Sequence, residues 1–240
     1  MVLGGTRFVS GSIDHTVKLW TFDGDLERTV EIDGPVFCVM ALHDGEHFVV
    51  GVGNGGLHLY HADGRLLHRF KGRVGEFGGW ESPLSVMVTH DGQHIVSGSG
   101  DGLVDVRSVA SKHLVSTCRG HNYMVWAVAA MPDGQRFLSG AADKTVRVWL
   151  LDGTHENTFH HLHTDTVWAL VALPDNQHAL SGSTDKTIQL FNVNDGAILR
   201  TFRHWSNRSS VCCLALLPDG LRFVIGCERD AYIAYHGLAP

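Results

Sequence analysis

The sequence predicts an all-β fold, made of a four-stranded unit that is repeated about six times. One observation is a recurring segment in which a short apolar stretch, a tight turn and an alternating stretch follow one another, as in PDGQRFLSGAADKTVRVW at 132–149. Alternation of β-branched and polar residues is typical of half-buried strands. A second observation is the many Asp-Gly pairs between such stretches. Glycine there supplies the positive φ that hairpin turns require, as we expect for Gly134.

The third observation is the spacing of the repeat. Its turn residue stands at positions 14, 54, 101, 143, 185 and 229, so the copies are 40, 47, 42, 42 and 44 residues apart. The copies are SGSIDHTVKLW (10–20), VGVGNGGLHLY (50–60), SGSGDGLVDVR (97–107), SGAADKTVRVW (139–149), SGSTDKTIQLF (181–191) and IGCERDAYIAY (225–235). A period of about 40–45 residues with four short strands is typical of a propeller blade. On these segments the whole chain resembles the WD40-repeat β-propellers.

The expected strands follow in chain order. Inner strands are VFCVMAL from 36, LSVMVTH from 84, MVWAVAA from 124, TVWALVA from 166 and SVCCLAL from 210. Second and third strands flank each turn residue, and outer strands are expected near 26–31, 65–70, 113–118, 156–159 and 198–202. We therefore expect six partial or complete four-stranded antiparallel blades in a single domain over residues 1–240.

The two ends of the chain depart from this pattern. Blade 1 is expected to lack its inner strand, because no residues precede TRFVSGS (6–12) to form it, and blade 6 to lack its outer strand. Two interpretations stay open. The chain is an N-terminally incomplete copy of a larger, seven-bladed ring, or it closes as a six-bladed ring with a defective seam.

Composition excludes several classes of protein. The net charge of −6 and the pI of about 6.3 argue against nucleic acid or an acidic membrane surface as a partner. No apolar run reaches the roughly 18 residues of a membrane span, and the N-terminus lacks the pattern of a signal peptide. Five cysteines without paired spacing predict reduced, mostly buried thiols, Cys212 and Cys213 included. We expect a cytoplasmic protein, with the nucleus as an alternative.

The resemblance implies a buried polar network in each blade, formed by a His, a Ser, the turn Asp and a Trp. A fully satisfied network fixes one strand register, whereas each orphaned group costs roughly 1–3 kcal/mol. Only one blade keeps the whole set, and two others keep three of its four members. The expected network residues are His121, Ser139, Asp143 and Trp149; His163, Ser181 and Asp185, with Phe191 in the Trp position; and Ser10, Asp14 and Trp20.

Enzymatic and metal-binding interpretations are weaker. The His, Ser and Asp types match a hydrolase triad, but they recur with the period of the fold, so we interpret them as structural. The Asp-Gly pairs are isolated at turns and do not form the clustered oxygen ligands of a calcium site. Crowded histidines near His160 do not have the spacing of a zinc site. We therefore expect no catalytic residues, no cofactor and no metal.

Large apolar residues at the starts of inner strands are the candidates for function. The resemblance implies that this face of a propeller, its top face, binds partners, and aromatic residues and Met are common at interface hot spots. The alternative is that Trp126 and Trp168 fill the channel or pack between blades. The insertion 71–82 and the basic segment 203–210 are second candidates. The expected partner-binding residues are Phe37, Tyr123, Met124, Trp126, Trp168 and Thr184.

The function expected from these observations is a non-catalytic scaffold or adaptor. Its partners would be other proteins or peptides, within a multiprotein complex. The alternative is a ubiquitin-binding propeller or a substrate receptor of a ubiquitin ligase, although the W-D-x-R motif that many such receptors carry is not in this sequence. An enzyme would need charged side chains converging at the channel mouth, where the expected strand starts are apolar.

Overall fold

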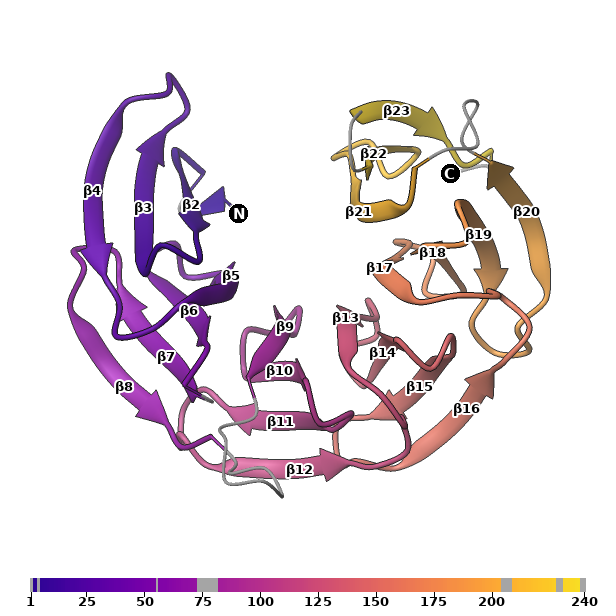
Figure 1. The fold of residues 1–240 in the computed structure, drawn as a ribbon, viewed down its shortest axis with the longest axis horizontal. Coiled ribbons are helices and arrows are strands. Elements are labelled where there is room, and N and C mark those ends of the chain that lie inside the picture. Colours follow the sequence, from indigo (N-terminus) through magenta and orange to yellow (C-terminus); the bar gives the residue numbers. More distant parts are fainter. Residues whose placement is uncertain are drawn as a thin grey trace. The chain divides into compact units, whose positions relative to one another are not determined.

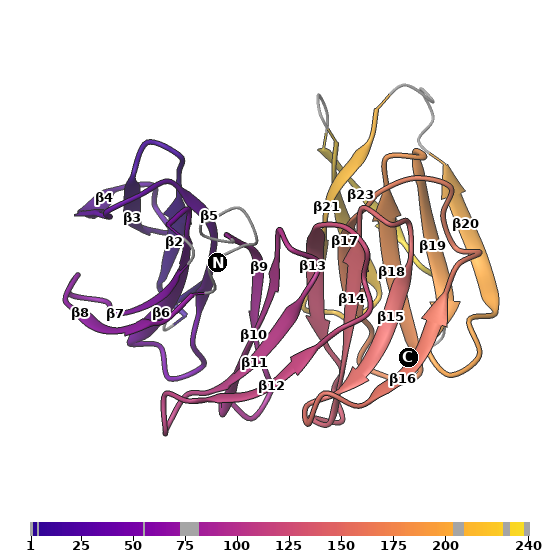
Figure 2. The ribbon, with the colours of Figure 1, turned by 60° about the horizontal axis from the view of Figure 1, so that its bottom comes forward.

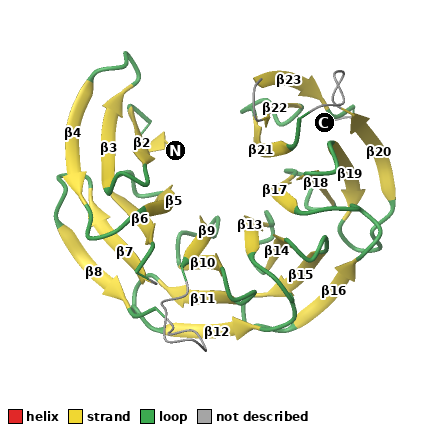
Figure 3. Cartoon of the chain, in the orientation of Figure 1, coloured by secondary structure: helices red, strands yellow, loops and turns green. Residues whose placement is uncertain are grey.

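The computed structural model describes residues 2–237, except 4, 55, 73–81, 204–208 and 228–230. Within these residues every regular element is a strand, and loops and turns join the strands (Figure 3). The strands form six antiparallel sheets, and the labels are those of Figure 1. The all-β fold class and the repeated four-stranded build are therefore confirmed.

Contacts divide the chain into two compact units, residues 1–117 and 118–240. Unit 1 holds sheets 1, 2 and 3. Sheet 1 is β1 (Val2–Leu3), β2 (Arg7–Gly11), β3 (Thr16–Thr21) and β4 (Leu26–Glu31). Sheet 2 is β5 (Val36–Ala41), β6 (His47–Val52), β7 (Gly56–His61) and β8 (Leu66–Phe70). Sheet 3 is β9 (Pro83–Val88), β10 (His94–Ser99), β11 (Val104–Ser108) and β12 (Leu114–Cys118).

Unit 2 holds sheets 4, 5 and 6. Sheet 4 is β13 (Val125–Ala130), β14 (Arg136–Ala141), β15 (Val146–Leu150) and β16 (His155–Phe159). Sheet 5 is β17 (Val167–Ala172), β18 (His178–Ser183), β19 (Thr187–Asn192) and β20 (Ile198–Arg203). Sheet 6 is β21 (Val211–Leu216), β22 (Arg222–Cys227) and β23 (Ala231–Tyr235). Both ribbon views show β17 to β20 side by side in chain order (Figures 1 and 2).

The first sheet corrects one prediction. Val2–Leu3 forms a short inner strand, β1, whose residues pair with Phe8 and Arg7 of β2. The expectation that no residues were available for this strand was wrong, because two residues suffice to pair with one end of β2. Sheet 6 has three strands within the described residues, β21, β22 and β23.

Tight turns between strands have the expected chemistry. Gly134 follows Asp133 with φ of 69°, in the left-handed region that costs glycine little. The Asp133 carboxylate accepts hydrogen bonds from the backbone N–H groups of Gln135 and Arg136 at 2.8 and 2.9 Å. Asp-Gly at these positions therefore caps its own turn and fixes where the next strand begins.

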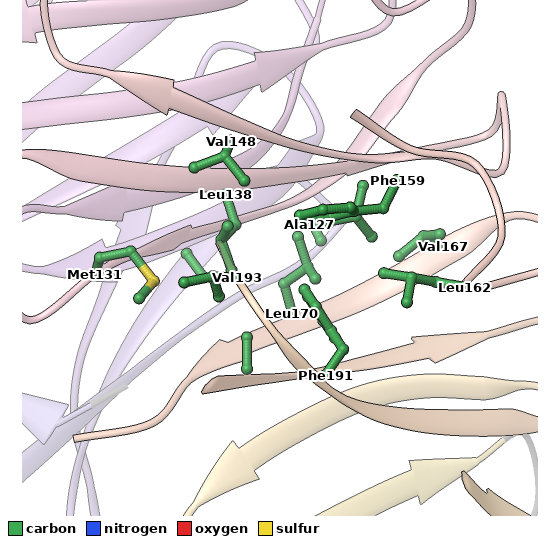
Figure 4. Packing of buried hydrophobic residues seen from close by; sticks show 13 residues of the cluster. Ala127, Met131, Leu138, Val148, Phe159, Leu162, Val167, Leu170, Phe191 and Val193 are labelled. Carbon is green, nitrogen blue, oxygen red and sulfur yellow. The ribbon is translucent and has the colours of Figure 1, made fainter. Parts of the chain in front are cut away.

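Neighbouring sheets within a unit share apolar clusters. In unit 2, Leu138 and Val148 of sheet 4 belong to one buried cluster with Val167, Leu170 and Phe191 of sheet 5 (Figure 4). The inner strand of one sheet and the middle strands of its neighbour thus bury each other. Each sheet packs against the next and stabilises it. The strand register within a sheet therefore fixes where the residues at the ends of its strands lie.

Candidate partner-binding surface

A β-bulge recurs at the start of each inner strand from β5 onward. In β13, Val125 pairs with Ala141 and Ala127 pairs with Gly140, so Trp126 has no residue opposite it. The skipped residues of the five inner strands are Phe37, Leu84, Trp126, Trp168 and Cys212. A bulge re-aims the side chain of its extra residue. Val125 and Ala127 are both buried, whereas Trp126 between them is half-buried.

Two of these bulge residues meet at the surface of unit 2. The ring centroids of Trp126 and Trp168 lie 4.4 Å apart, with the ring planes inclined by 37°. The Trp168 indole Nε1–H donates a hydrogen bond to Thr184 Oγ1 at 2.6 Å. Such an aromatic pair contributes about 0.5–1.5 kcal/mol beyond its buried area. The pair is therefore held in place while part of each indole stays accessible.

Two further candidates precede Trp126 in the chain. Tyr123 is 65% exposed and Met124 is 47% exposed. The Met124 carbonyl accepts a hydrogen bond from the Ala142 N–H at 2.9 Å, which fixes the backbone that carries Met124. We call Tyr123, Met124, Trp126, Trp168 and Thr184 the tryptophan surface. Its tyrosine and methionine side chains are exposed on an ordered backbone, which favours docking of a partner.

Phe37 lies in unit 1 and is described by itself. It is 45% exposed at the bulge of β5, and its ring covers Gly53 in the turn that follows β6. It thus has the same place in sheet 2 as Trp126 has in sheet 4. That Phe37 forms one arc with the tryptophan surface stays a prediction.

The polar network of sheet 4 contains every hydrogen bond expected of it. His121 Nδ1 lies 2.8 Å from Asp143 Oδ2, and His121 Nε2 lies 2.7 Å from Ser139 Oγ. The Trp149 indole donates to Ser139 Oγ at 2.8 Å. With neutral His121, Nδ1–H donates to the carboxylate and Nε2 accepts from the serine hydroxyl, so each proton has an acceptor. Thr145 Oγ1 donates to the other carboxylate oxygen, Asp143 Oδ1, at 2.7 Å.

This Ser–His–Asp chain has the connectivity of a hydrolase triad but not its accessibility. Ser139 is 0% exposed, and its oxygen accepts the Trp149 N–H. Burial lowers the pKa of His121 although Asp143 opposes this effect. Burial alone would raise the pKa of Asp143, but hydrogen bonds from His121 and Thr145 outweigh it and hold the pKa below the ordinary 3.8. The geometry favours a structural role, since a substrate cannot reach the serine.

Sheets 5 and 1 contain parts of the same network. In sheet 5, His163 Nδ1 lies 2.9 Å from Asp185 Oδ2, and His163 Nε2 lies 2.7 Å from Ser181 Oγ. Phe191 takes the place of the tryptophan and is fully buried. In sheet 1, the Trp20 indole donates to Ser10 Oγ at 2.9 Å. The Asp14 carboxylate there accepts from the Thr16 N–H and hydroxyl at 3.0 and 2.7 Å.

Sheet 3 holds a polar group that the sequence reasoning missed. Arg107 stands in the tryptophan position, and its Nη2 donates to Asp105 Oδ2 at 3.0 Å and to the Lys71 carbonyl at 3.1 Å. Thr117 Oγ1 donates to Asp105 Oδ1 at 2.8 Å. Both charged residues are buried, at 9% and 5% exposure. The signal was present in the sequence, because Asp and Arg two residues apart on a strand lie on one face.

The cysteines correct another prediction. All five thiols are free; Cys118 is buried, Cys38 and Cys227 are half-buried, and Cys212 and Cys213 are both exposed. Cys212 is the bulge residue of β21, so the simple alternation that would bury one of the pair does not apply.

Several expectations fall outside the described residues. Most of the insertion 71–82 and the centre of the basic segment 203–210 belong to this part of the chain. Among the described residues no group of three or more His, Cys, Asp or Glu is arranged to hold a metal ion. No helix long and apolar enough to cross a membrane is present there either.

Comparison with known protein families gives a match at three places. The family model described as "WD domain, G-beta repeat" matches residues 4–21, 112–149 and 153–192. These ranges contain the networks of sheets 1, 4 and 5. No curated protein matches the chain.

Proposed function

The chain contains WD40 repeats at three places, and from this premise we propose that it is a non-catalytic adaptor that binds protein partners through the tryptophan surface. WD40 repeats generally serve as scaffolds for protein interactions and are generally not catalytic. The adaptor role of this chain and its membership of a multiprotein complex are the proposal.

The observation that carries the proposal is the half-exposed Trp126–Trp168 pair. Because each indole belongs to the extra residue of a β-bulge, neither follows the alternating pattern of the side chains along its strand. Thr184 accepts a hydrogen bond from the Trp168 indole. Large apolar side chains that are both ordered and accessible lose little conformational entropy when a partner binds. Tyr123 and Met124, three and two residues before Trp126 in the chain, are exposed as well, and Met adapts its shape to different partners.

The side chains of the tryptophan surface also indicate which class of partner it would bind. Aromatic and thioether side chains favour an apolar side chain, which they can enclose, over a phosphate or a metal ion. Hydroxyl groups at the margin, such as that of Thr184, suit a peptide backbone. We therefore propose a protein or peptide with at least one exposed apolar anchor as the partner class. No observation within the described residues favours the ubiquitin alternative.

The test compares affinity capture by the full chain and by a Trp126→Ala/Trp168→Ala variant, with mass spectrometry of the captured proteins. The matched control is Ile198→Ala/Leu199→Ala on β20, which removes side chains that are 41% and 44% exposed in the same unit. We expect specific partners to be reduced at least about tenfold by the tryptophan variant and retained by the control.

Circular dichroism and thermal unfolding check that both variants stay folded. If the tryptophan variant is folded and captures the same partners in the same amounts, the tryptophan surface is packing only, and the proposal fails. Titration of a purified partner, followed by indole fluorescence, then separates direct contact with the tryptophans from an indirect effect.

A further inference from the structure

One turn of sheet 3 departs from the pattern of the other sheets. The turn between the third strand and the outer strand contains a residue with positive φ in each of sheets 1 to 5. In sheets 1, 2, 4 and 5 this residue is a glycine, namely Gly24, Gly64, Gly153 and Gly196. In sheet 3 it is Lys112, with φ of 64°. The left-handed conformation costs glycine little, whereas a lysine side chain disfavours it.

Backbone hydrogen bonds show that Lys112 and Gly196 are equivalent. Asn192 and Ser108 each end the third strand of their sheet. The Gly196 N–H donates to the Asn192 carbonyl at 2.9 Å, and the Lys112 N–H donates to the Ser108 carbonyl at 3.1 Å. The two turns are therefore of one type, and glycine fits this type without strain.

The other left-handed side chains have simpler explanations. His15, Lys144 and Lys186 lie in the turns between the second and third strands of sheets 1, 4 and 5, so they recur with the period of the fold. Asn176 is of a residue type that tolerates this conformation. Lys112 is the one described non-glycine residue with positive φ in a turn that leads to an outer strand. Such an outlier points to a function of its side chain.

The same turn has lost its carboxylate. In the other four turns the glycine follows an aspartate. In sheet 5, Asp195 Oδ1 accepts a hydrogen bond from the Ala197 N–H at 2.9 Å. In sheet 3, Ser111 takes the place of the aspartate, and its hydroxyl accepts from the His113 N–H at 3.4 Å. No Asp or Glu occurs between residues 106 and 132 of the sequence.

A further basic group, His68 of sheet 2, faces this turn. His68 pairs with Leu59, which belongs to the apolar cluster that joins sheets 2 and 3 and includes Val109 of the turn. Paired residues share a face, so His68 lies on the face of sheet 2 that is turned toward sheet 3. Burial lowers the pKa of His68, and the charges of Lys112 and His113 lower it further. Basic groups of two sheets thus meet without a carboxylate between them.

The junction of sheets 4 and 5 has neutral groups at the same place. Asn157 pairs with Val148 as His68 pairs with Leu59. The Asn157 side-chain N–H donates to the Asn194 carbonyl at 3.2 Å. A hydrogen bond between neutral groups is therefore sufficient at such a junction, and the packing of the sheets does not require the basic cluster.

Two apolar residues adjoin the basic cluster. Leu114 and Val115 begin β12, the outer strand of sheet 3, and they are 49% and 48% exposed. We call His68, Lys112, His113, Leu114 and Val115 the Lys112 site. A ligand that complements this site carries negative charge beside apolar groups.

We propose that the Lys112 site docks a segment of a partner protein in which acidic residues stand beside apolar residues. The carboxylates neutralise the basic groups, whose mutual repulsion is thereby relieved, and the apolar side chains cover Leu114 and Val115. A phosphate group alone would leave this apolar pair uncovered. All five residues of the site belong to unit 1 and the tryptophan surface belongs to unit 2, so this inference does not rest on the proposed function.

The experiment uses a labelled peptide of Glu-Glu-Leu repeats and its Gln-Gln-Leu counterpart as probes of the full chain. Fluorescence anisotropy measures the binding of each peptide. We expect the glutamate peptide to bind at least about tenfold more tightly at low salt and to lose this advantage as salt is added. A carbodiimide, which joins a carboxylate to a lysine amine, then locates the contact. Peptide mapping should find the glutamate peptide linked to Lys112 in preference to Lys144.

Two variants separate the charge of Lys112 from its strain. Lys112→Gly removes both, so binding of the glutamate peptide should weaken about fivefold while the midpoint of thermal unfolding stays unchanged or rises. Lys112→Glu keeps a side chain at this φ and reverses the charge, so binding should weaken at least about tenfold. The matched control is Lys144→Gly, which removes the same charge and a similar φ of 70° from unit 2. It should bind the peptide like the unmodified chain.

Three results would overturn the proposal. The first is a folded Lys112→Gly variant that binds the glutamate peptide as tightly as the unmodified chain, which would make the lysine a turn residue only. The second is equal binding of the glutamate and glutamine peptides. The third is a carbodiimide link, formed without peptide, between Lys112 and a carboxylate of this chain, which would mean that the chain itself supplies the anion.

Discussion

Sheets 3 and 4 fill the same buried position on the third strand with different side chains. Sheet 4 places an indole against a serine, a histidine and an aspartate, and its network carries charge on the carboxylate alone when His121 is neutral. Sheet 3 places Arg107 in the position of the indole and neutralises it with Asp105. The strand geometry is the same, so the fold accommodates at this position either an indole or a guanidinium paired with a carboxylate.

The comparison teaches where the cost of a substitution lies. Removing the serine or the indole of the sheet 4 network orphans a hydrogen bond, whereas removing one member of a buried ion pair leaves an uncompensated charge. Sheet 3 should therefore be more sensitive to single substitutions than sheet 4, although its ion pair need not be the more stabilising arrangement.

The largest expected effect is that of Arg107→Ala. Loss of the guanidinium leaves the Asp105 carboxylate buried, and the free energy of unfolding should fall by about 3–5 kcal/mol. Urea denaturation measures this. The matched control is Asp105→Leu/Arg107→Met, which removes both charges and should cost far less. A double variant as unstable as the single one would contradict the assignment of the cost to an unpaired charge.

A smaller effect separates sheet 4 from sheet 5. Ser139→Ala orphans the Trp149 indole N–H and His121 Nε2, and we expect a loss of about 2–3 kcal/mol. Ser181→Ala orphans His163 Nε2 but no indole, because Phe191 takes that position, so about 1–2 kcal/mol should be lost. Thermal and urea unfolding of the two variants give the difference. Equal losses would show that the indole hydrogen bond adds nothing to sheet 4.

The smallest effect is a dependence on pH. Burial holds the pKa of His121 below its ordinary 6.5, and the hydrogen bonds described above hold that of Asp143 below 3.8. The unfolded chain therefore binds more protons at these two groups than the folded chain does. Their contribution to stability is complete above about pH 6.5 and is lost as the pH falls, first through His121 and then through Asp143.

Urea denaturation between pH 7 and pH 5 measures the first stage. A His121→Gln variant should lower the slope of stability against pH by up to about 1.4 kcal/mol per pH unit, the value for one proton. The control is His155→Gln, which alters an exposed histidine of the same sheet. An unchanged slope in the His121 variant would mean that this histidine does not titrate between the two states.

Much of the fold followed from local chemistry that the sequence displays. Asp-Gly pairs predicted the turns, and glycine at the predicted Gly134 does adopt positive φ. The resemblance to WD40 repeats implied that His121, Ser139, Asp143 and Trp149 share a sheet. These predictions succeed because a hairpin register and an alternating pattern depend on residues close together in the chain.

The tryptophan surface was only partly predictable. Aromatic residues at the strand starts were visible in the sequence, but the bulges that expose Trp126 and Trp168 were not, since a bulge depends on how two strands register against each other. The hydrogen bond between Trp168 and Thr184 joins β17 to the turn that follows β18 and follows from that register.

The sequence by itself determined the strands, the turns and the repeat, because each depends on a local pattern or on the period of the fold. The tertiary structure alone decided which equivalent residues are covered. Leu190 and Ile233, or Cys38 and Cys213, have the same local environment in their own sheets and differ in exposure. Burial on a sheet face depends on the neighbouring sheet, and that neighbour is set by packing rather than by the residues of the strand itself.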